Sequence, residues 1–346
     1  MTVPGLAEAA DRFDRALAAV DTPAATAVIG ELLDRGEDPV AVLVEVIAAA
    51  QRSVGLRWQR GEWPVAREHA ATGVSAAAVE VVARHVRRLP VTRGRVVVAC
   101  AEREWHALPA MLIGHALRAN GWDVTLLGAS TTTARLNRYL HDLGPDAAAV
   151  SCSVLGALPA GRRFIEAATA AGIPVLAGGS AFGPDPVRAL ALGATAWAPG
   201  AYSAIDAVAK LPVVVPAAPP LPTAPAAEQA ELEQAHQRLV AGLRTTWTLA
   251  ADVLVDAPVV VDSLQAVAKD VLNQVLHAVS AALLTGDPRP IPETAAWLAD
   301  LLAARGAEVR LVVELGELLA AGLGDFPLAR ELVVAHWAGG LVGTER

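Results

Sequence analysis

The sequence predicts an α/β fold joined to all-α parts: a four-helix bundle, a doubly wound parallel-sheet domain and a C-terminal helical domain. Three observations predict it. Apolar residues recur at helical spacing near the N-terminus, short β-rich runs then alternate with helices, and helical spacing returns after a proline-rich stretch. We expect a bundle over 1–90, a sheet domain over 91–211, a linker over 212–227 and a helical domain over 228–346.

The first domain has the pattern of four helices over residues 5–88, with breaks at 21–23, 36–39 and 61–64. Proline near the start of three of these helices suits a first helical turn, where no backbone N–H is needed. Short loops between helices of this length predict an antiparallel bundle.

The second domain alternates strands with helices. The strand-like runs lie at 96–100, 124–128, 147–151, 175–179 and 195–197. This alternation is typical of a parallel doubly wound sheet, in which ligands bind beyond the carboxyl ends of the strands.

The linker carries six prolines and almost no charge, so we expect it to be stiff and extended. Residues 228–342 then look wholly helical. Their breaks fall at 257–258, 286–288, 306 and 324–325.

Charge and hydropathy disfavour two classes of partner. The net charge is −8 and Lys and Arg do not cluster, which disfavours direct nucleic-acid binding. No uncharged apolar run is long enough to predict a membrane span, and no basic-then-apolar leader opens the chain. We expect a cytoplasmic protein whose two cysteines, Cys100 and Cys152, are buried thiols rather than a structural disulfide.

Small and polar residues gather at the predicted strand ends. Glu104, Trp105 and His106 follow the first strand, and further strand ends carry Gly128, Ser151, Ser153, Gly178 and Gly179. A loop histidine can ligate a large planar metal cofactor, and small residues beyond it can leave a slot for a nucleotide tail. Glu104 can hold the other ring nitrogen and fix the tautomer. The simpler alternative is a loop histidine whose ring nitrogens are satisfied by hydrogen bonds and which binds no ligand.

A second cluster is predicted at one end of the bundle. Trp58 ends the third helix, and Glu68 and His69 open the fourth. An indole can pack over an apolar ligand, while a carboxylate and an imidazole can bind a sugar or an amide. Helix-end packing and capping is the alternative.

These residues resemble a known family over roughly residues 5–209. The second domain is similar to the cobalamin-binding domain of methionine synthase, corrinoid methyltransferases and light-sensing CarH-like repressors, and the Trp58 to Glu68-His69 spacing matches the light-sensing branch. The resemblance implies that His106 is the lower axial ligand of cobalt. It also implies that Ser151 and Gly178-Gly179 line the slot of the nucleotide tail, and that the bundle cluster covers the upper face, where adenosylcobalamin carries its 5′-deoxyadenosyl group.

The chain departs from the family pattern at four positions. Glu104 replaces Asp, Pro109 replaces Gly and Ser153 replaces Leu. Gln59 stands where CarH-like repressors have a histidine that captures cobalt after photolysis. A bis-histidine photoproduct formed by that residue is therefore not expected, which leaves water or His69 for the site.

The C-terminal domain resembles the helical module of photocobilins, which bind a bilin such as biliverdin beside cobalamin. No cysteine follows residue 152, so any bilin here would be noncovalent or would reach back to the core domain. We consider Trp247 for stacking, His277 for pyrrole nitrogens and three arginines for propionates. Those arginines are Arg238, Arg244 and Arg310. A solvated face at His277 and a dimerisation bundle are the alternatives.

The function implied is a cobalamin-dependent photoreceptor rather than an enzyme. Light would break the Co–C bond, the bundle would shift against the sheet domain, and a homo-oligomer would change its quaternary structure to signal to an unidentified output partner. A corrinoid carrier for a methyltransferase and a light-independent cobalamin sensor remain open.

Overall fold

A computed structural model describes residues 4–251 and 264–341, and the expected break at 257–258 lies outside these ranges. The chain forms two compact units. Unit 1 contains residues 1–58 and 65–219, and unit 2 contains 220–346 together with the short turn 59–64. The predicted fold class is confirmed by the helical N-terminal region, the five-stranded parallel sheet and the C-terminal helices.

The bundle in unit 1 has the predicted breaks between its helices. Its elements are α1 (Pro4–Ala18), α2 (Thr22–Asp34), a continuous segment of α3 (Pro39–Ala41), π-helical η1 (Val42–Ala48) and α4 (Ala49–Gln59), and then α5 (Val65–Val86). Asp21 accepts a hydrogen bond from Ala24 N–H at 2.9 Å, and Asp38 caps the next helix in the same way. Each aspartate therefore satisfies N–H groups that a helix start leaves unpaired.

The segment 39–59 is the one described helix long and apolar enough, by length and composition, to cross a membrane. Its most apolar residues, Val42, Leu43, Val46 and Ile47, are fully buried in the bundle. That is the usual environment of a core helix in a helix bundle.

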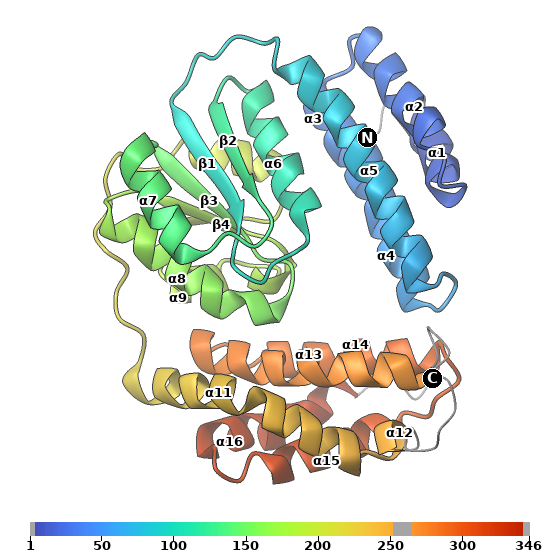
Figure 1. Cartoon of the computed structure of the whole chain (residues 1–346), viewed down its shortest axis with the longest axis vertical. Coiled ribbons are helices and arrows are strands. Elements are labelled where there is room, and N and C mark those ends of the chain that lie inside the picture. The colour runs from blue at the N-terminus through green and yellow to red at the C-terminus, as the bar shows by residue number, and fades with distance from the viewer. Residues whose placement is uncertain (1–3, 252–263, 342–346) are drawn as a thin grey trace. The chain divides into compact units, whose positions relative to one another are not determined.

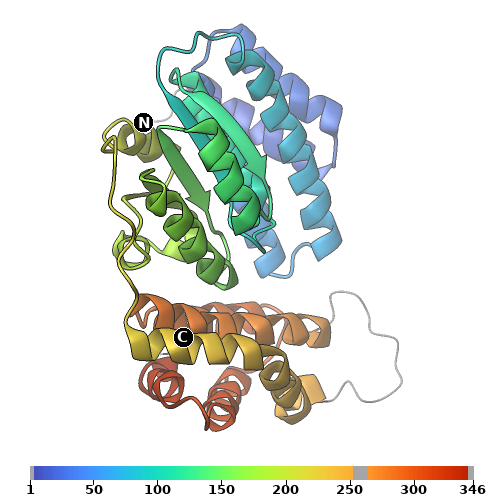
Figure 2. The ribbon, with the colours of Figure 1, turned by 60° about the vertical axis from the view of Figure 1, so that its left-hand side comes forward.

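The sheet has the strand order β2-β1-β3-β4-β5, and all four pairs are parallel. Its strands are β1 (Arg95–Cys100), β2 (Asp123–Gly128), β3 (Ala147–Ser151), β4 (Val175–Gly178) and β5 (Ala196–Ala198). Helices α6 (Ala107–Ala119) and α10 (Ala201–Val208) pack on one face, with α7 (Thr133–Leu143) and α8 (Leu158–Ala170) on the other side (Figures 1 and 2). The order of the strands changes direction between β1 and β3, where such folds bind ligands.

The register brings three small residues into one row at the carboxyl ends of the strands. Cys100 lies opposite Ser151, and Ser151 lies opposite Gly178. Residues two apart on a strand share a face, so this row faces the layer of α6 and α10, as Val98 and Ala149 do in the core cluster. The slot predicted from the sequence therefore falls between the sheet and these two helices.

The bundle packs on α6 through α5 and η1 (Figure 1). Arg118 of α6 donates hydrogen bonds to the carbonyls of Arg87 and Leu89, just beyond the end of α5, at 3.2 and 2.6 Å. Tyr202 of α10 donates to Glu45 of η1 at 3.5 Å. Bundle and sheet domain thus form one unit.

The linker predicted over 212–227 ends earlier than expected, because α11 begins at Thr223. Pro225 is tolerated in the first helical turn, where the N–H has no helical partner. The preceding segment is fixed to unit 1. Ala218 N–H donates to Thr169 Oγ1 at 2.9 Å, and Arg162 Nη2 donates to Pro219 O at 2.6 Å.

The described secondary structure of unit 2 consists of helices joined by short turns. Its helices are α11 (Thr223–Thr246), α12 (Thr248–Ala251), α13 (Leu264–Thr285), α14 (Pro290–Ala303), α15 (Arg310–Gly322) and α16 (Pro327–His336), followed by the 3₁₀ turn η5 (Trp337–Gly340). Glu228 of α11 accepts hydrogen bonds from Leu328 N–H and Ala329 N–H at the start of α16. This carboxylate joins two helices that are a hundred residues apart in the sequence.

Candidate functional site

Glu104 and His106 form the centre of the site, at the carboxyl end of β1. Glu104 is fully buried although it lies in a loop. Its Oε1 accepts hydrogen bonds from His106 N–H at 2.8 Å and from His106 Nδ1 at 2.7 Å. Its Oε2 accepts from Ser153 N–H at 2.5 Å and from Val154 N–H at 3.0 Å, which ties the loop after β1 to the loop after β3.

These hydrogen bonds fix the charge of the carboxylate and the tautomer of the imidazole. Burial alone would raise the pKa of Glu104, but the hydrogen bonds from the His106 ring and from the His106 and Ser153 N–H groups outweigh it and lower the pKa. The pKa of His106 is raised, chiefly by its hydrogen bond to Glu104 and against the effect of burial. In the neutral ring Nδ1 carries the proton, so Nε2 keeps a lone pair for a ligand.

The His106 side chain presents that nitrogen outward, since 61% of its surface is exposed. A histidine whose other nitrogen is bound to a carboxylate has the arrangement that orients metal ligands and increases their basicity. The dyad can therefore hold a metal from one side. The predicted partnership of Glu104 with His106 is present in the structure.

Ser151 lies next to this dyad at the end of β3. It is 7% exposed, and its hydroxyl has no hydrogen-bond partner among the described residues. A buried hydroxyl without a partner costs about 1–3 kcal/mol, so such a group suits a position that a ligand completes. The predicted slot residue thus offers a free donor and acceptor.

Two glycines at the end of β4 allow neighbouring backbone segments to approach closely. A Cβ on Gly178 would lie 3.1 Å from the Ala198 carbonyl, and one on Gly179 would lie 2.3 Å from the Cys152 carbonyl. Gly179 also has a φ of 104°. Backbone approach this close requires glycine, which explains the Gly-Gly pair in the sequence. Gly128 ends β2 at a φ of 77°, opposite Ala99, where the register shifts.

The second predicted cluster lies at the end of the bundle. Trp58 is half-buried in the last turn of α4, and Glu68 is in the first turn of α5. Glu68 is close enough to His106 to contribute to its raised pKa, so the structure brings these two sites together. His69 is 75% exposed, and its Nε2 lies 3.5 Å from Glu68 Oε2.

Sequence reasoning missed two residues of the hydrogen-bonded chain that begins at Glu68, of which Thr72 bonds Glu68 directly and Gln51 bonds Thr72. Thr72 Oγ1 donates to Glu68 Oε1 at 2.9 Å, and Gln51 Nε2 donates to Thr72 Oγ1 at 2.6 Å. The spacing of four between Glu68 and Thr72 places both on one face of α5 and was the available signal. The spacing gives no indication of Gln51, which comes from another helix.

The residues proposed for a bilin do not form a common site. Trp247 is fully buried, and its Nε1 donates to the Leu311 carbonyl at 2.8 Å. The protein therefore covers this side chain completely, and its stacking on a ligand stays a prediction. His277 stacks on His236 with ring centroids 4.9 Å apart, in the interface of α11 and α13. Arg238 and Arg310 each face a carboxylate, of Asp325 and Glu308, and Arg244 is exposed.

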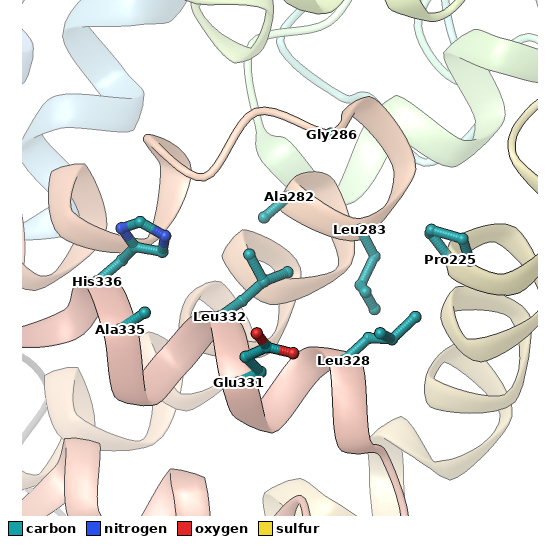
Figure 3. A pocket seen from close by; sticks show the side chains of 9 residues that line it. All are labelled: Pro225, Ala282, Leu283, Gly286, Leu328, Glu331, Leu332, Ala335 and His336. Atoms are coloured by element: carbon teal, nitrogen blue, oxygen red, sulfur yellow. The ribbon is translucent and has the colours of Figure 1, made fainter.

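A pocket of about 320 Å³ does open in unit 2, between α11, α13 and α16 (Figure 3). Its walls are mostly apolar, with Glu331 and His336 among them. The lining residues are Pro225, Ala282, Leu283, Gly286, Leu328, Glu331, Leu332, Ala335 and His336. None of the predicted bilin contacts lines it.

Comparisons with protein-family models match both parts of unit 1. Residues 94–206 match a model described as a B12 binding domain, and residues 9–83 match a second model with the same description. A search of curated proteins finds no significant match. The chain therefore contains a cobalamin-binding module made of the bundle and the sheet domain.

Comparison with solved structures finds one protein with a similar fold over 58% of this chain, and two further matches with lower scores. The monomethylamine corrinoid protein of Methanosarcina barkeri is 16% identical to this chain. The match covers 58% of this chain and 97% of that protein, with a TM-score of 0.50. A chain of the methanol:cobalamin methyltransferase complex of the same organism is 19% identical. This match covers 59% of the present chain and 80% of the other, with a TM-score of 0.32. A cobalamin-binding protein of Desulfitobacterium hafniense DCB-2 is 19% identical. This match covers 58% of the present chain and 95% of that protein, with a TM-score of 0.31.

Proposed function

We propose that this chain binds cobalamin with His106 as its lower axial ligand and uses the adenosyl form as a light sensor. The observation that carries the binding mode is the dyad: a fully buried Glu104 holds His106 Nδ1 at 2.7 Å and turns Nε2 outward. Ser151 and Gly178 fit the nucleotide tail, since one offers an unpartnered hydroxyl and the other leaves no side chain in the slot.

The chain's own residues do three things in this proposal. Glu104 keeps the proton on Nδ1, so that the ligating nitrogen stays basic. Ser151 hydrogen-bonds the tail and so replaces the water lost on burial. Trp58 and Glu68 cover the upper side and give an apolar surface and an acceptor to a nucleoside.

When bound, adenosylcobalamin supplies a cobalt–carbon bond that light can break. Loss of the upper group would remove what Trp58 and Glu68 cover, so the bundle would change its position on α6. We propose that a homo-oligomer passes this change to an output partner. The position of Glu68 near His106 supports this reading.

A second candidate is a corrinoid carrier of a methyltransferase system. The structural likeness to the monomethylamine corrinoid protein fits this candidate at least as well as the light sensor. A carrier must expose the upper cobalt face to its partner enzymes, and the half-buried Trp58 in the last turn of α4 is the feature that argues against it. A sensor that responds to cobalamin binding alone is the third reading.

Illumination of the adenosylcobalamin-loaded protein separates these candidates. A light sensor should change its absorption spectrum within the exposure and change its oligomer size on a sizing column, relative to a dark control. Free adenosylcobalamin under the same lamp is the control for photolysis without protein. If the adenosylcobalamin-loaded protein keeps its oligomer size in light, and the same protein loaded with methylcobalamin transfers its methyl group to a thiol acceptor in the dark, the carrier replaces our proposal.

A further inference from the structure

The polar chain that begins at Glu68 continues into the bundle and ends on an unsatisfied atom. Glu68 accepts from Thr72, and Thr72 accepts from Gln51. A threonine hydroxyl has a single proton, and here it is donated to the carboxylate. The contact at Gln51 must therefore come from its NH₂ group, which fixes the orientation of the amide.

This orientation leaves Gln51 Oε1 without a donor. The atom is buried and has no hydrogen-bond partner among the residues that the structure describes. A buried carbonyl of this kind calls for an N–H or O–H group from outside the protein. The same wall carries a second acceptor, the Glu68 carboxylate.

Open space lies on the same helix face. Gln51, Gly55 and Trp58 are spaced four and three residues apart along α4, so they share one face. A Cβ placed on Gly55 would meet no heavy atom within 4 Å. This face therefore carries an acceptor at Gln51, a glycine where a side chain would have room, and the indole of Trp58.

We propose that Gln51, Thr72 and Gly55 select the upper ligand of cobalamin, favouring a nucleoside with hydrogen-bond donors over a methyl group. This inference rests on the proposed cobalamin site. Two acceptors on one wall match the amino group and hydroxyls of a nucleoside, and a methyl group would leave them unpaired. Thr72 acts as a positioning residue, because it holds both the Gln51 amide and the Glu68 carboxylate.

The first test measures dissociation constants for adenosylcobalamin and methylcobalamin in the dark. Gln51→Leu should weaken adenosylcobalamin binding about tenfold and leave methylcobalamin binding unchanged, so the preference falls about tenfold. Thr72→Val, which keeps the side-chain shape, should reduce the preference by a smaller factor. The exposed neighbour Arg52→Leu is the matched control and should keep the wild-type ratio. An unchanged ratio in Gln51→Leu would overturn the proposal.

The second test fills the gap. Gly55→Leu should exclude adenosylcobalamin while aquocobalamin, whose upper ligand is a water molecule, still binds with wild-type affinity. Gly73→Leu is the matched control, since Gly73 lies on an exposed face of α5 and a Cβ placed on it would also meet no heavy atom within 4 Å. Equal adenosylcobalamin affinity in both leucine variants would contradict the assigned position of the upper ligand.

Failure of this inference can be told from failure of the proposed function. If the wild-type protein binds no cobalamin, the proposed site itself is wrong. If the wild type binds both forms and the variants leave their ratio unchanged, the site stands and the selecting residues lie elsewhere. Circular dichroism of each apoprotein shows whether the variant is folded before either conclusion is drawn.

Discussion

Two buried polar groups around the Glu104–His106 dyad in unit 1 differ from two buried polar groups in the core of unit 2. In unit 1, Ser151 Oγ and Gln51 Oε1 are buried with no hydrogen-bond partner among the described residues, and both belong to the surroundings of the Glu104–His106 dyad. In unit 2, Gln229 donates to Ser280 at 3.0 Å, and Trp247 donates to a main-chain carbonyl. These polar groups of unit 2 thus have partners within the protein.

This difference separates a binding site from a structural core. An unsatisfied buried polar atom costs about 1–3 kcal/mol, whereas a satisfied pair is close to neutral when both partners are replaced together. Unit 1 carries two such costs beside the dyad, where a ligand can compensate them, and others elsewhere, such as the Ser75 hydroxyl. In unit 2 the Gln229–Ser280 pair joins α11 to α13. The following experiments break or sharpen this contrast.

The largest effect is expected from His106→Ala. The change removes the nitrogen that the dyad turns outward, so cobalamin affinity should fall by more than the ~10- to 100-fold typical of losing an outer-shell partner. Titration of the apoprotein followed by absorption measures the affinity and shows whether a histidine ligates the cobalt. A variant whose bound spectrum equals that of the wild type would refute the ligand assignment.

Glu104→Gln should have the next largest effect. The amide keeps the size of the carboxylate, but its NH₂ group would face the N–H donors of Ser153 and Val154, so the free energy of unfolding should fall by about 1–3 kcal/mol. Cobalamin affinity should fall ~10- to 100-fold, because the imidazole loses its charged partner. Thermal unfolding and titration measure the two effects.

Glu102→Gln is the matched control for Glu104→Gln, in the same loop and two residues earlier. It should keep wild-type stability and affinity. If both variants behave alike, the four hydrogen bonds to Glu104 are not what holds the dyad.

Ser151→Val tests the tail slot separately from the metal ligand. The apoprotein should unfold at a temperature equal to or above that of the wild type, since an unpartnered hydroxyl is replaced by apolar methyl groups, one in its place and one added. Cobalamin should bind at least about tenfold more weakly, because the slot is filled, while cobinamide, which lacks the nucleotide tail, should bind as before. Ser75→Ala, which removes another buried and unpartnered hydroxyl in the bundle, is the control and should leave both affinities unchanged.

Much of the fold and the centre of the site follow from local sequence pattern. The bundle breaks, the five strands and the row Cys100, Ser151, Gly178 are set by periodicity and by strand ends, which neighbouring residues determine. The dyad could be predicted because its residues are two positions apart. Gln51 could not, since its role depends on packing between two helices.

In unit 2, by contrast, the local sequence pattern did not predict the environment of a candidate site residue. Trp247 was a reasonable ligand contact by residue type, but tertiary packing buries it completely. The periodicity of a helix predicts which residues share a face and does not say what covers that face. The early start of α11 has a similar cause, since Pro225 suits a linker and a first helical turn equally well.

Gln229→Leu combined with Ser280→Ala should have a small effect. The double variant should stay within about 1 kcal/mol of wild-type stability, because both partners of the pair are removed, whereas Ser280→Ala alone should cost about 1–3 kcal/mol by leaving the Gln229 amide buried and unpaired. Neither should change cobalamin affinity. Chemical unfolding measures the free energy of unfolding of the wild type and both variants. A double variant less stable than Ser280→Ala alone would show that the pair is more than a satisfied structural contact.

The smallest effect concerns His115, on the side of α6 that faces α5. Burial lowers its pKa, Glu80 opposes that change and Arg87 adds to it. Because the folded-state pKa lies below the unfolded value, the unfolded chain binds more protons as the pH falls through about 6.5, so stability is lost in that direction. NMR titration of the His115 ring measures its pKa directly, and His115→Gln should flatten the pH dependence of the unfolding free energy between neutral and mildly acid pH. A ring pKa at or above that of the unfolded chain would show that the interface between bundle and α6 is wetter than its packing indicates.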